Sequence, residues 1–388
     1  MLTERIASAI RERAPVSRRF FTTYATEIAG TAEAVAARLS SGGRIFAFGR
    51  GAYATDAQHV AVEFVHPVLV GKPALPASDL SCCFEAALPI LAGAHDVAIG
   101  FGPPEGDATV ARALSRARAS GVFTIAFPGS DADFAVPAVA GDEHVHQEIV
   151  EIAGHILYES VHVFLEHRQR NDDVGASAFL YPFLGGDAPS REDIAAQVTV
   201  SVQTKAADAE ALRERVAREQ SEAIAGAVAL MAHGIAHGGR LLLFGNGGSA
   251  TDATDWALDC VMPPNGLAPI AALSLASEPA TITAIANDVG REFIFLRQLI
   301  AHVRPNDVVV ALSTSGGSAN IVVALEEARK RGNSTIALLG YDGGEIYRRG
   351  LADGPIVVAS DYIPRIQEAQ GTIYHTMRRA VEWQRDAA

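Results

Sequence analysis

The sequence predicts an α/β protein with two tandem domains, each built on a doubly wound parallel sheet flanked by helices. Short apolar runs without polar interruption recur along the chain, as strands buried on both faces of a parallel sheet require. These runs are VAIGF (97–101), FTIAF (123–127), VVVAL (308–312) and TIALLG (335–340). Ala-rich segments with helical periodicity separate them, and this alternation is typical of α/β folds.

The chain also repeats itself. FGRGAYATDAQHVAVEF (48–64) aligns with FGNGGSATDATDWALDC (244–260) at an offset of 196 residues, with eight of seventeen positions identical. Residues 95–114 align with 306–325 and residues 147–155 with 367–375, in the same order. Three ordered matches predict a duplicated domain, and the strand–turn–helix units predict a flavodoxin- or Rossmann-like sheet in each copy.

The domain boundaries follow from the repeat and from one change in composition. Residues from 167 to 190 are polar and then rich in Gly and Pro, which is typical of a connecting segment. We expect the first copy at 1–168, a linker at 169–190 and the second copy at 191–388. The second copy opens with a long helical segment.

Composition excludes several classes of protein. The net charge is −13, whereas a nucleic-acid-binding surface is normally basic. Three cysteines predict neither a disulfide framework nor a zinc ribbon. The N-terminal stretch MLTERIASAIRERA lacks an apolar signal core, and no apolar run reaches about 18 residues. We expect a cytoplasmic protein without nucleic-acid or membrane partners.

The segment LSTSGGSAN (312–320) predicts a phosphate site. It lies between a buried strand and a helix, and its hydroxyls belong to Ser313, Thr314, Ser315 and Ser318. Two glycines allow close approach of a ligand, and the helix N-terminus adds oriented N–H groups. The alternative is a serine-rich helix cap without a ligand, but one hydroxyl suffices for a cap.

A second Gly-rich loop, GNGGSA (245–250), brings Asn246, Gly247 and Ser249 to the same crevice at the carboxyl ends of neighbouring strands. In the first copy the corresponding loops are GRGAYA (49–54) and GPPEGD (102–107). Two prolines remove N–H donors there, and two acidic side chains would repel phosphate. We expect that the first copy has lost its phosphate site.

These motifs resemble those of the sugar isomerase (SIS) domain, and within it the sedoheptulose 7-phosphate isomerase (phosphoheptose isomerase) family. GNGGSATDA, SLAS (274–277), ANDVGRE (286–292), STSGGSAN and RIQEAQGTIYH (365–375) follow that family's order through nearly all of the second copy. The resemblance implies sugar or interface contacts from Asn287 and Asp288 and substrate contacts from Gln367. The family has one domain per chain and forms tetramers, so a homodimer of this chain would contain four domains.

The resemblance also implies a catalytic and metal-binding face, formed by a His and a Glu at i and i+4 and by a Gln and a His eight residues apart. The first copy has His59, Glu63, Gln147 and His155, and the second has Asp255, Asp259, Gln367 and His375. Two imidazoles, a carboxylate and an amide oxygen in the first copy could bind Zn²⁺. Asp255, Asp259 and His375 form an alternative metal set. Histidines that only pack or cap are the other interpretation.

The implied reaction moves a proton between C1 and C2 of a sugar phosphate through an enediol, which needs a base and an acid. We expect Glu63 as the base and His155 as the acid, acting on C1 and C2 of a sugar whose phosphate group is held by the second copy. In the alternative arrangement the second copy works alone with Asp259 and His375. A catalytically inactive module that binds a sugar phosphate or another protein is the rival function.

Overall fold

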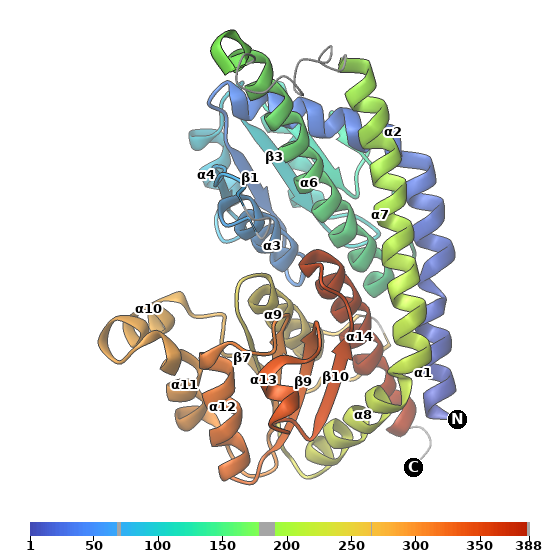
Figure 1. The fold of residues 1–388 in the computed structure, drawn as a ribbon, viewed down its shortest axis with the longest axis vertical. Coiled ribbons are helices and arrows are strands. Elements are labelled where there is room, and N and C mark those ends of the chain that lie inside the picture. Colours follow the sequence, from blue (N-terminus) through green and yellow to red (C-terminus); the bar gives the residue numbers. More distant parts are fainter. Residues whose placement is uncertain (68–70, 178–190, 265, 386–388) are drawn as a thin grey trace. The chain divides into compact units, whose positions relative to one another are not determined.

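The computed structural model describes residues 1–67, 71–177, 191–264 and 266–385, which form two compact units. The N-terminal unit is Pro15–Asp208, and the C-terminal unit combines Met1–Ala14 with Ala209–Ala388. Each is an α/β unit with a five-stranded parallel sheet, so the predicted fold class is confirmed (Figure 1). None of the described helices is long and apolar enough to span a bilayer.

The sheet of the N-terminal unit has the strand order β2-β1-β3-β4-β5. Helices α3 and α6 pack together, as do α4 and α5. The elements are α2 (Arg13–Ser40), β1 (Ile45–Phe48), α3 (Tyr53–Val65), β2 (Ala77–Asp79), α4 (Phe84–Leu91), β3 (Val97–Phe101), α5 (Ala108–Ala119), β4 (Phe123–Phe127), β5 (Phe134–Ala135), α6 (Glu143–Ser177) and α7 (Arg191–Glu219), which continues into the C-terminal unit.

The sheet of the C-terminal unit has the order β10-β9-β8-β6-β7. Read in reverse, from β7 to β10, this is the strand order of the first sheet, so the two units share one topology. Its elements are α1 (Leu2–Arg11), α8 (Ser221–Ala236), β6 (Leu241–Gly245), α9 (Gly248–Val261), β7 (Ala272–Ser274), α10 (Pro279–Asp288), η2 (Arg291–Phe293), α11 (Ile294–His302), β8 (Val308–Ser313), α12 (Ala319–Lys330), β9 (Ser334–Gly340), α13 (Gly344–Arg348), β10 (Gly354–Val358) and α14 (Ile363–Arg385).

The uninterrupted apolar strands fill two cores, one on each face of this second sheet. Leu241 and Leu243 belong to the core that α8, α9 and α14 cover, whereas Leu242 and Phe244 belong to the core that α11 and α12 cover. Successive side chains of a strand point to opposite faces. A strand covered by helices on both faces is therefore apolar at every position.

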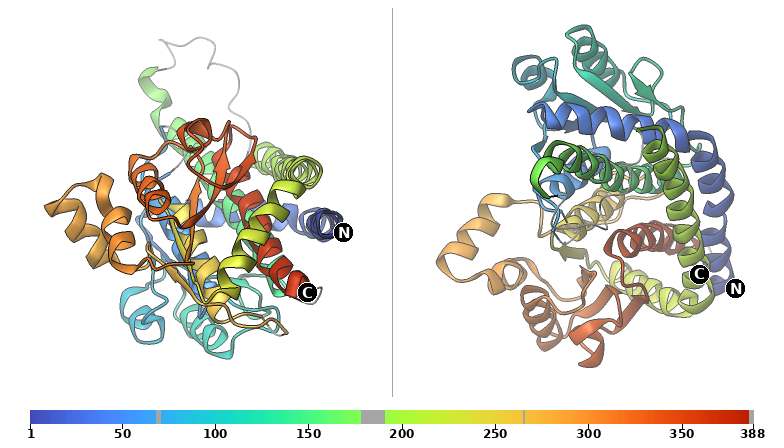
Figure 2. Two further views of the ribbon diagram at one scale, coloured as in Figure 1. Left: turned by 90° about the horizontal axis from the view of Figure 1, so that it is seen from below. Right: turned by 45° about the horizontal axis from the view of Figure 1, so that its top comes forward.

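The first helix joins the C-terminal unit, although the sequence assigned residues 1–168 to one domain. Ile6 and Ile10 of α1 are 0% exposed and belong to the same core cluster as Ile224 of α8. Helix α1 contacts α8 and α14 (Figure 2). Its apolar stripe is buried there because it needs an apolar partner, which adjacency in the chain does not specify.

The predicted linker at 169–190 overlaps a helix. Helix α6 continues to Ser177, so the first part of that segment is helical, and residues 178–190 lie outside the described part of the chain. Polar residues after position 167 are compatible with helix as well as with loop, since composition alone does not separate a solvated helix from a linker.

Candidate functional site

The serine-rich loop of the C-terminal unit connects the end of β8 to the start of α12, as the sequence predicted. Gly316 has φ +60°, and a Cβ atom at this position would lie 2.2 Å from the carbonyl oxygen of Gly343, so only glycine fits. The backbone N–H of Gly316 donates to the Ser313 hydroxyl at 3.1 Å. The N–H of Gly317 donates to the Ser315 hydroxyl at 3.3 Å. Two backbone N–H groups of the turn are thus hydrogen-bonded to serine hydroxyls of the same turn.

Ser318 is the N-cap residue of α12, yet its side chain makes no capping hydrogen bond. Its own carbonyl accepts the N–H groups of Ile321 and Val322, each at 3.0 Å. Thr314 is half-buried and Ser315 is exposed. The loop therefore presents hydroxyl groups beside the N-terminus of a helix, where the helix dipole favours an anion.

The second Gly-rich loop is tied to this one by an amide pair. Asn246 donates to the Oδ1 atom of Asn320 at 3.0 Å, and Asn320 donates back to the Oδ1 atom of Asn246 at 2.8 Å. Gly247 has φ +57°, and Ser249 is buried in the first turn of α9. Asn320 was missed from the sequence, although a polar residue in the first turn of α12 was a usable signal.

In the N-terminal unit, a carboxylate occupies the corresponding helix N-terminus. Asp107 caps α5 and accepts the backbone N–H groups of Thr109 and Val110 at 2.7 and 3.0 Å. The Arg50 guanidinium lies 3.4 Å from the same carboxylate. The N-terminus of α5 is therefore already occupied by the Asp107 carboxylate, which is paired with the Arg50 guanidinium.

Four predicted residues of the N-terminal unit lie on facing helices, His59 and Glu63 on α3 and Gln147 and His155 on α6. The Nε2 atoms of His59 and His155 are 3.2 Å apart. The Oε1 atom of Glu63 lies 3.1 Å from the Nε2 atom of His155 and 3.8 Å from that of His59. Gln147 instead donates to the Oδ2 atom of Asp56 at 3.1 Å.

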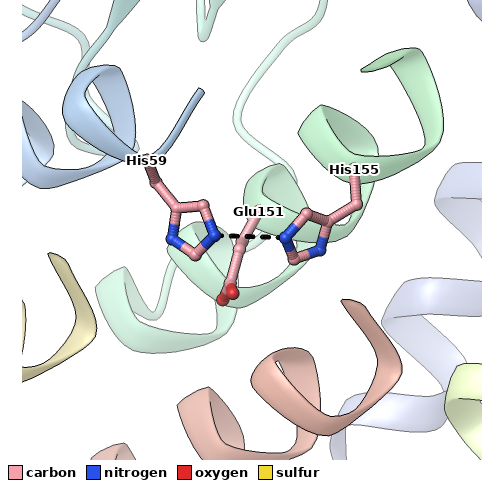
Figure 3. A group of neighbouring side chains, drawn as sticks. All are labelled: His59, Glu151 and His155. Carbon is pink, nitrogen blue, oxygen red and sulfur yellow. Dashed lines mark hydrogen bonds between the residues drawn. The ribbon is translucent and has the colours of Figure 1, made fainter. Parts of the chain in front are cut away.

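Glu151 is a neighbour that the sequence reasoning missed. It lies on α6 one turn before His155, and its carboxylate faces the two imidazoles (Figure 3). One ligand atom each from His59, Glu151 and His155 lie within 4.8 Å of one another. The spacing of Gln147, Glu151 and His155 at i, i+4 and i+8 was a usable signal, because such residues share a helix face.

The C-terminal unit has a second carboxylate–imidazole cluster between α9 and α14. The Nε2 atom of His375 lies 3.2 Å from the Oδ2 atom of Asp259 and 3.4 Å from that of Asp255. The Tyr374 hydroxyl donates to Asp255 at 2.8 Å, and the Arg378 guanidinium donates to the Asp259 carbonyl at 3.2 Å. All of these side chains are buried.

The remaining predicted residues are less closely tied to these clusters. Gln367 is buried in the second turn of α14. Asn287 and Asp288 are exposed at the end of α10, where the Asn287 amide donates to the Asp288 carboxylate at 2.7 Å.

Comparison with known proteins gives matches to sequence families and to solved structures. The family model described as "SIS domain" matches residues 206–340. A phosphoheptose isomerase of Citrifermentans bemidjiense is 44% identical over 168 residues, which are 42% of this chain and 85% of the relative. A phosphoheptose isomerase of Geobacter sulfurreducens is 43% identical over 173 residues, 44% of this chain and 89% of the relative.

Among solved structures, the tagatose-6-phosphate ketose/aldose isomerase of Escherichia coli aligns with 100% of this chain and 94% of its own. The TM-score is 0.56 and the sequence identity 15%. At that identity the likeness concerns the fold alone.

Proposed function

The chain belongs to the family of SIS-domain phosphoheptose isomerases, and from this premise we propose that it interconverts sedoheptulose 7-phosphate and D-glycero-D-manno-heptose 7-phosphate. The observation that carries the proposal is the loop between β8 and α12, where Ser318 stands at a helix N-terminus without using its hydroxyl as a cap. A phosphate monoester carries nearly two negative charges and three acceptor oxygens, which such a loop can satisfy.

In this proposal the phosphate group contacts the hydroxyls of Ser313, Thr314, Ser315 and Ser318. The loop at 246–249 contributes Asn246, Gly247 and Ser249, and the Asn246–Asn320 amide pair keeps the two loops at a fixed distance. Gln367, Asn287 and Asp288 are proposed contacts to the sugar hydroxyls or to a neighbouring subunit.

Proton transfer between C1 and C2 needs a carboxylate base and a second group that exchanges protons with the oxygens. Two pairs have suitable distances, Glu63 with His155 and Asp259 with His375, at 3.1 and 3.2 Å. We assign the reaction to Asp259 and His375, because they share a unit with the phosphate loop. Glu63 and His155 instead lie close to His59 and Glu151, whose side chains could bind a metal ion together with His155.

Zinc is the cation that suits two imidazoles and a carboxylate. His59, Glu63 and His155 would hold it, and it would supply a fixed positive charge between α3 and α6. The proton transfer proposed above does not use that charge.

A second candidate function is favoured by one difference between the copies. Asp259 stands where the N-terminal unit has Glu63, and its side chain is one methylene shorter. A displacement of about 1 Å can cost a hundredfold in rate, so a protein that binds the sugar phosphate without converting it is the alternative.

The two conservative variants Asp259→Asn and Glu63→Gln test the assignment. We expect Asp259→Asn to lower kcat by about 10²–10⁴-fold with little change in KM, and Glu63→Gln to retain turnover. The reverse result, in a Glu63→Gln protein with unchanged melting temperature, would assign the base to Glu63. Sugar-phosphate binding without conversion by the wild-type chain would select the binding function.

A further inference from the structure

The N-terminal unit has a cavity of about 210 Å³ between α4 and α5. Its apolar lining includes Phe84 and Leu88 of α4 and Ala113 and Ala117 of α5. An engineered apolar cavity of about 150 Å³ binds benzene, so this one has room for a single ring with a small substituent. Drug-sized ligands occupy pockets of about 300–1,000 Å³. The volume therefore suits a small molecule and not a peptide.

The cavity belongs to a region in which the two copies of the domain differ in length. Phe84 follows Asp79, the last residue of β2, by five positions. Its counterpart Phe295 follows Ser274, the last residue of β7, by 21 positions. Each of these phenylalanines stacks on a phenylalanine of a central strand, at ring-centroid distances of 4.7 and 5.0 Å. The additional residues of the C-terminal unit form α10 and η2.

The difference in length changes what covers the helix after the third strand of each unit. In the C-terminal unit this helix is α12, which contacts both η2 and α11. Ile282 and Ile285 of α10 pack against the core cluster to which α12 contributes. The N-terminal counterpart α5 packs against α4, β3 and β4, and the short segment between Asp79 and Phe84 has no residues for a further helix. The side of α5 that faces α4 is therefore covered by less protein than the matching side of α12.

The polar side chains of the lining leave one cation available to a ligand. Arg112 lies 3.7 Å from the Glu85 carboxylate and donates to the Thr109 hydroxyl at 3.3 Å. The Ser120 hydroxyl donates to the carbonyl oxygen of Arg116 at 3.2 Å. The exposed guanidinium of Arg116 makes no hydrogen bond or ion pair with any residue that the structure describes. The cavity thus combines an apolar interior with a single unpaired positive charge at its rim.

This charge distinguishes the N-terminal copy from the other one. The position of Arg116 corresponds to Glu327 of α12, whose carboxylate lies 2.6 Å from the Arg331 guanidinium. A guanidinium presents parallel N–H donors that match the two oxygens of a carboxylate. A sugar does not suit the same cavity, because most of its hydroxyls would face apolar side chains without a hydrogen-bond partner. The lining therefore favours a ligand with an apolar body and one carboxylate.

We propose that the cavity between α4 and α5 is a binding site for a small aromatic carboxylate. The ring packs against Phe84, Leu88 and Ala117, and the carboxylate contacts the Arg116 guanidinium. Removal of the ring from water supplies most of the affinity, and the Phe84 ring offers it an aromatic neighbour. The carboxylate stays at the rim, where water still reaches it. This site lies wholly within the N-terminal unit and does not depend on isomerisation by the chain.

The test titrates the full-length protein with benzoate and follows binding by saturation-transfer NMR. Benzyl alcohol is the neutral probe of similar shape. We expect wild type to bind benzoate at least about 3-fold more tightly than benzyl alcohol. Arg116→Gln should weaken benzoate binding by about 3- to 10-fold and leave the affinity for benzyl alcohol unchanged, because only the carboxylate contacts the guanidinium. Equal affinities of wild type for the two probes would overturn the proposal.

A second pair of variants locates the bound ring. Ala117→Leu places a larger side chain in the cavity, and Ala119→Leu makes the same change at an exposed residue of α5 outside the lining. We expect Ala117→Leu to abolish benzoate binding and Ala119→Leu to retain it. The proposal is overturned if wild type binds no benzoate, or if Ala117→Leu binds it as wild type does. Displacement of benzoate by inorganic phosphate would assign it to another anion site and also overturn the proposal. If Ala117→Leu does not fold, Arg116→Gln decides the question, and neither result depends on turnover.

Discussion

Replacing Ser318 with alanine separates ligand binding from folding, because this residue occupies a cap position without capping. Removal of a serine cap normally costs about 1 kcal/mol. Here the hydroxyl makes no capping bond, so the melting temperature should stay within about 1 °C of wild type. A hydrogen bond to a charged group contributes about 1.5–3 kcal/mol, so its loss should raise KM for the sugar phosphate by about 10- to 150-fold.

The matched control is Asp107→Ala in the N-terminal unit. Its carboxylate accepts two N–H groups of α5, so this variant should lose about 1 kcal/mol of stability, which is about 2–4 °C in a unit of this size. Its KM should not change. Steady-state kinetics and calorimetry measure both variants. A lower melting temperature with unchanged KM in Ser318→Ala would refute the assignment of this hydroxyl to phosphate.

Two further predictions concern the turn and the pH dependence. Gly316→Ala should weaken sugar-phosphate binding and destabilise the C-terminal unit, because the added Cβ would lie 2.2 Å from the carbonyl oxygen of Gly343. Gly317→Ala should leave the stability of the unit nearly unchanged, because the nearest atom to its added Cβ is 3.9 Å away. An equal loss of stability in the two variants would contradict this geometry. Burial lowers the pKa of His146 from 6.5 to about 4. Between these values the unfolded chain binds a proton that the folded unit does not, so stability should be full above pH 6.5 and fall as the pH drops toward 4. Urea midpoints at pH 7.5 and 5 measure this loss, and His146→Gln should make it smaller.

The histidine in that prediction is neutral for a structural reason. Its Nδ1 atom accepts the N–H of Val139 at 3.2 Å, which leaves the Nε2–H to donate to the Gly102 carbonyl at 3.2 Å. A second proton would occupy the nitrogen that accepts. Nothing in the local sequence of His146 indicates this, because the Gly102 carbonyl comes from a residue 44 positions away in the chain.

The sequence predicts best what depends on local pattern. The apolar runs at 308–312 and 335–340 predicted strands because every residue of a strand between two helix layers is apolar. The serine loop was recognisable because glycines and hydroxyls between a strand and a helix have few other uses. These features require only neighbours in the chain.

The features that the sequence left open depend on long-range contacts. The amphipathic pattern of α1 predicts a buried face without naming its partner, and the structure places that face in the core of the C-terminal unit. The Asn246–Asn320 pair joins residues 74 positions apart. Glu151 was overlooked because comparison of the two copies favours shared residues, and the corresponding position of the second copy is Gly371.

The central claim is that this chain converts a ketose phosphate into an aldose phosphate. The most direct measurement follows sedoheptulose 7-phosphate with the purified protein in D₂O by proton NMR. We predict growth of the anomeric signals of the aldose heptose 7-phosphate, with solvent deuterium entering at C2, as an enediol requires. An unchanged ketose in a sample where calorimetry shows binding that depends on Ser318 would contradict the claim and identify a binding protein.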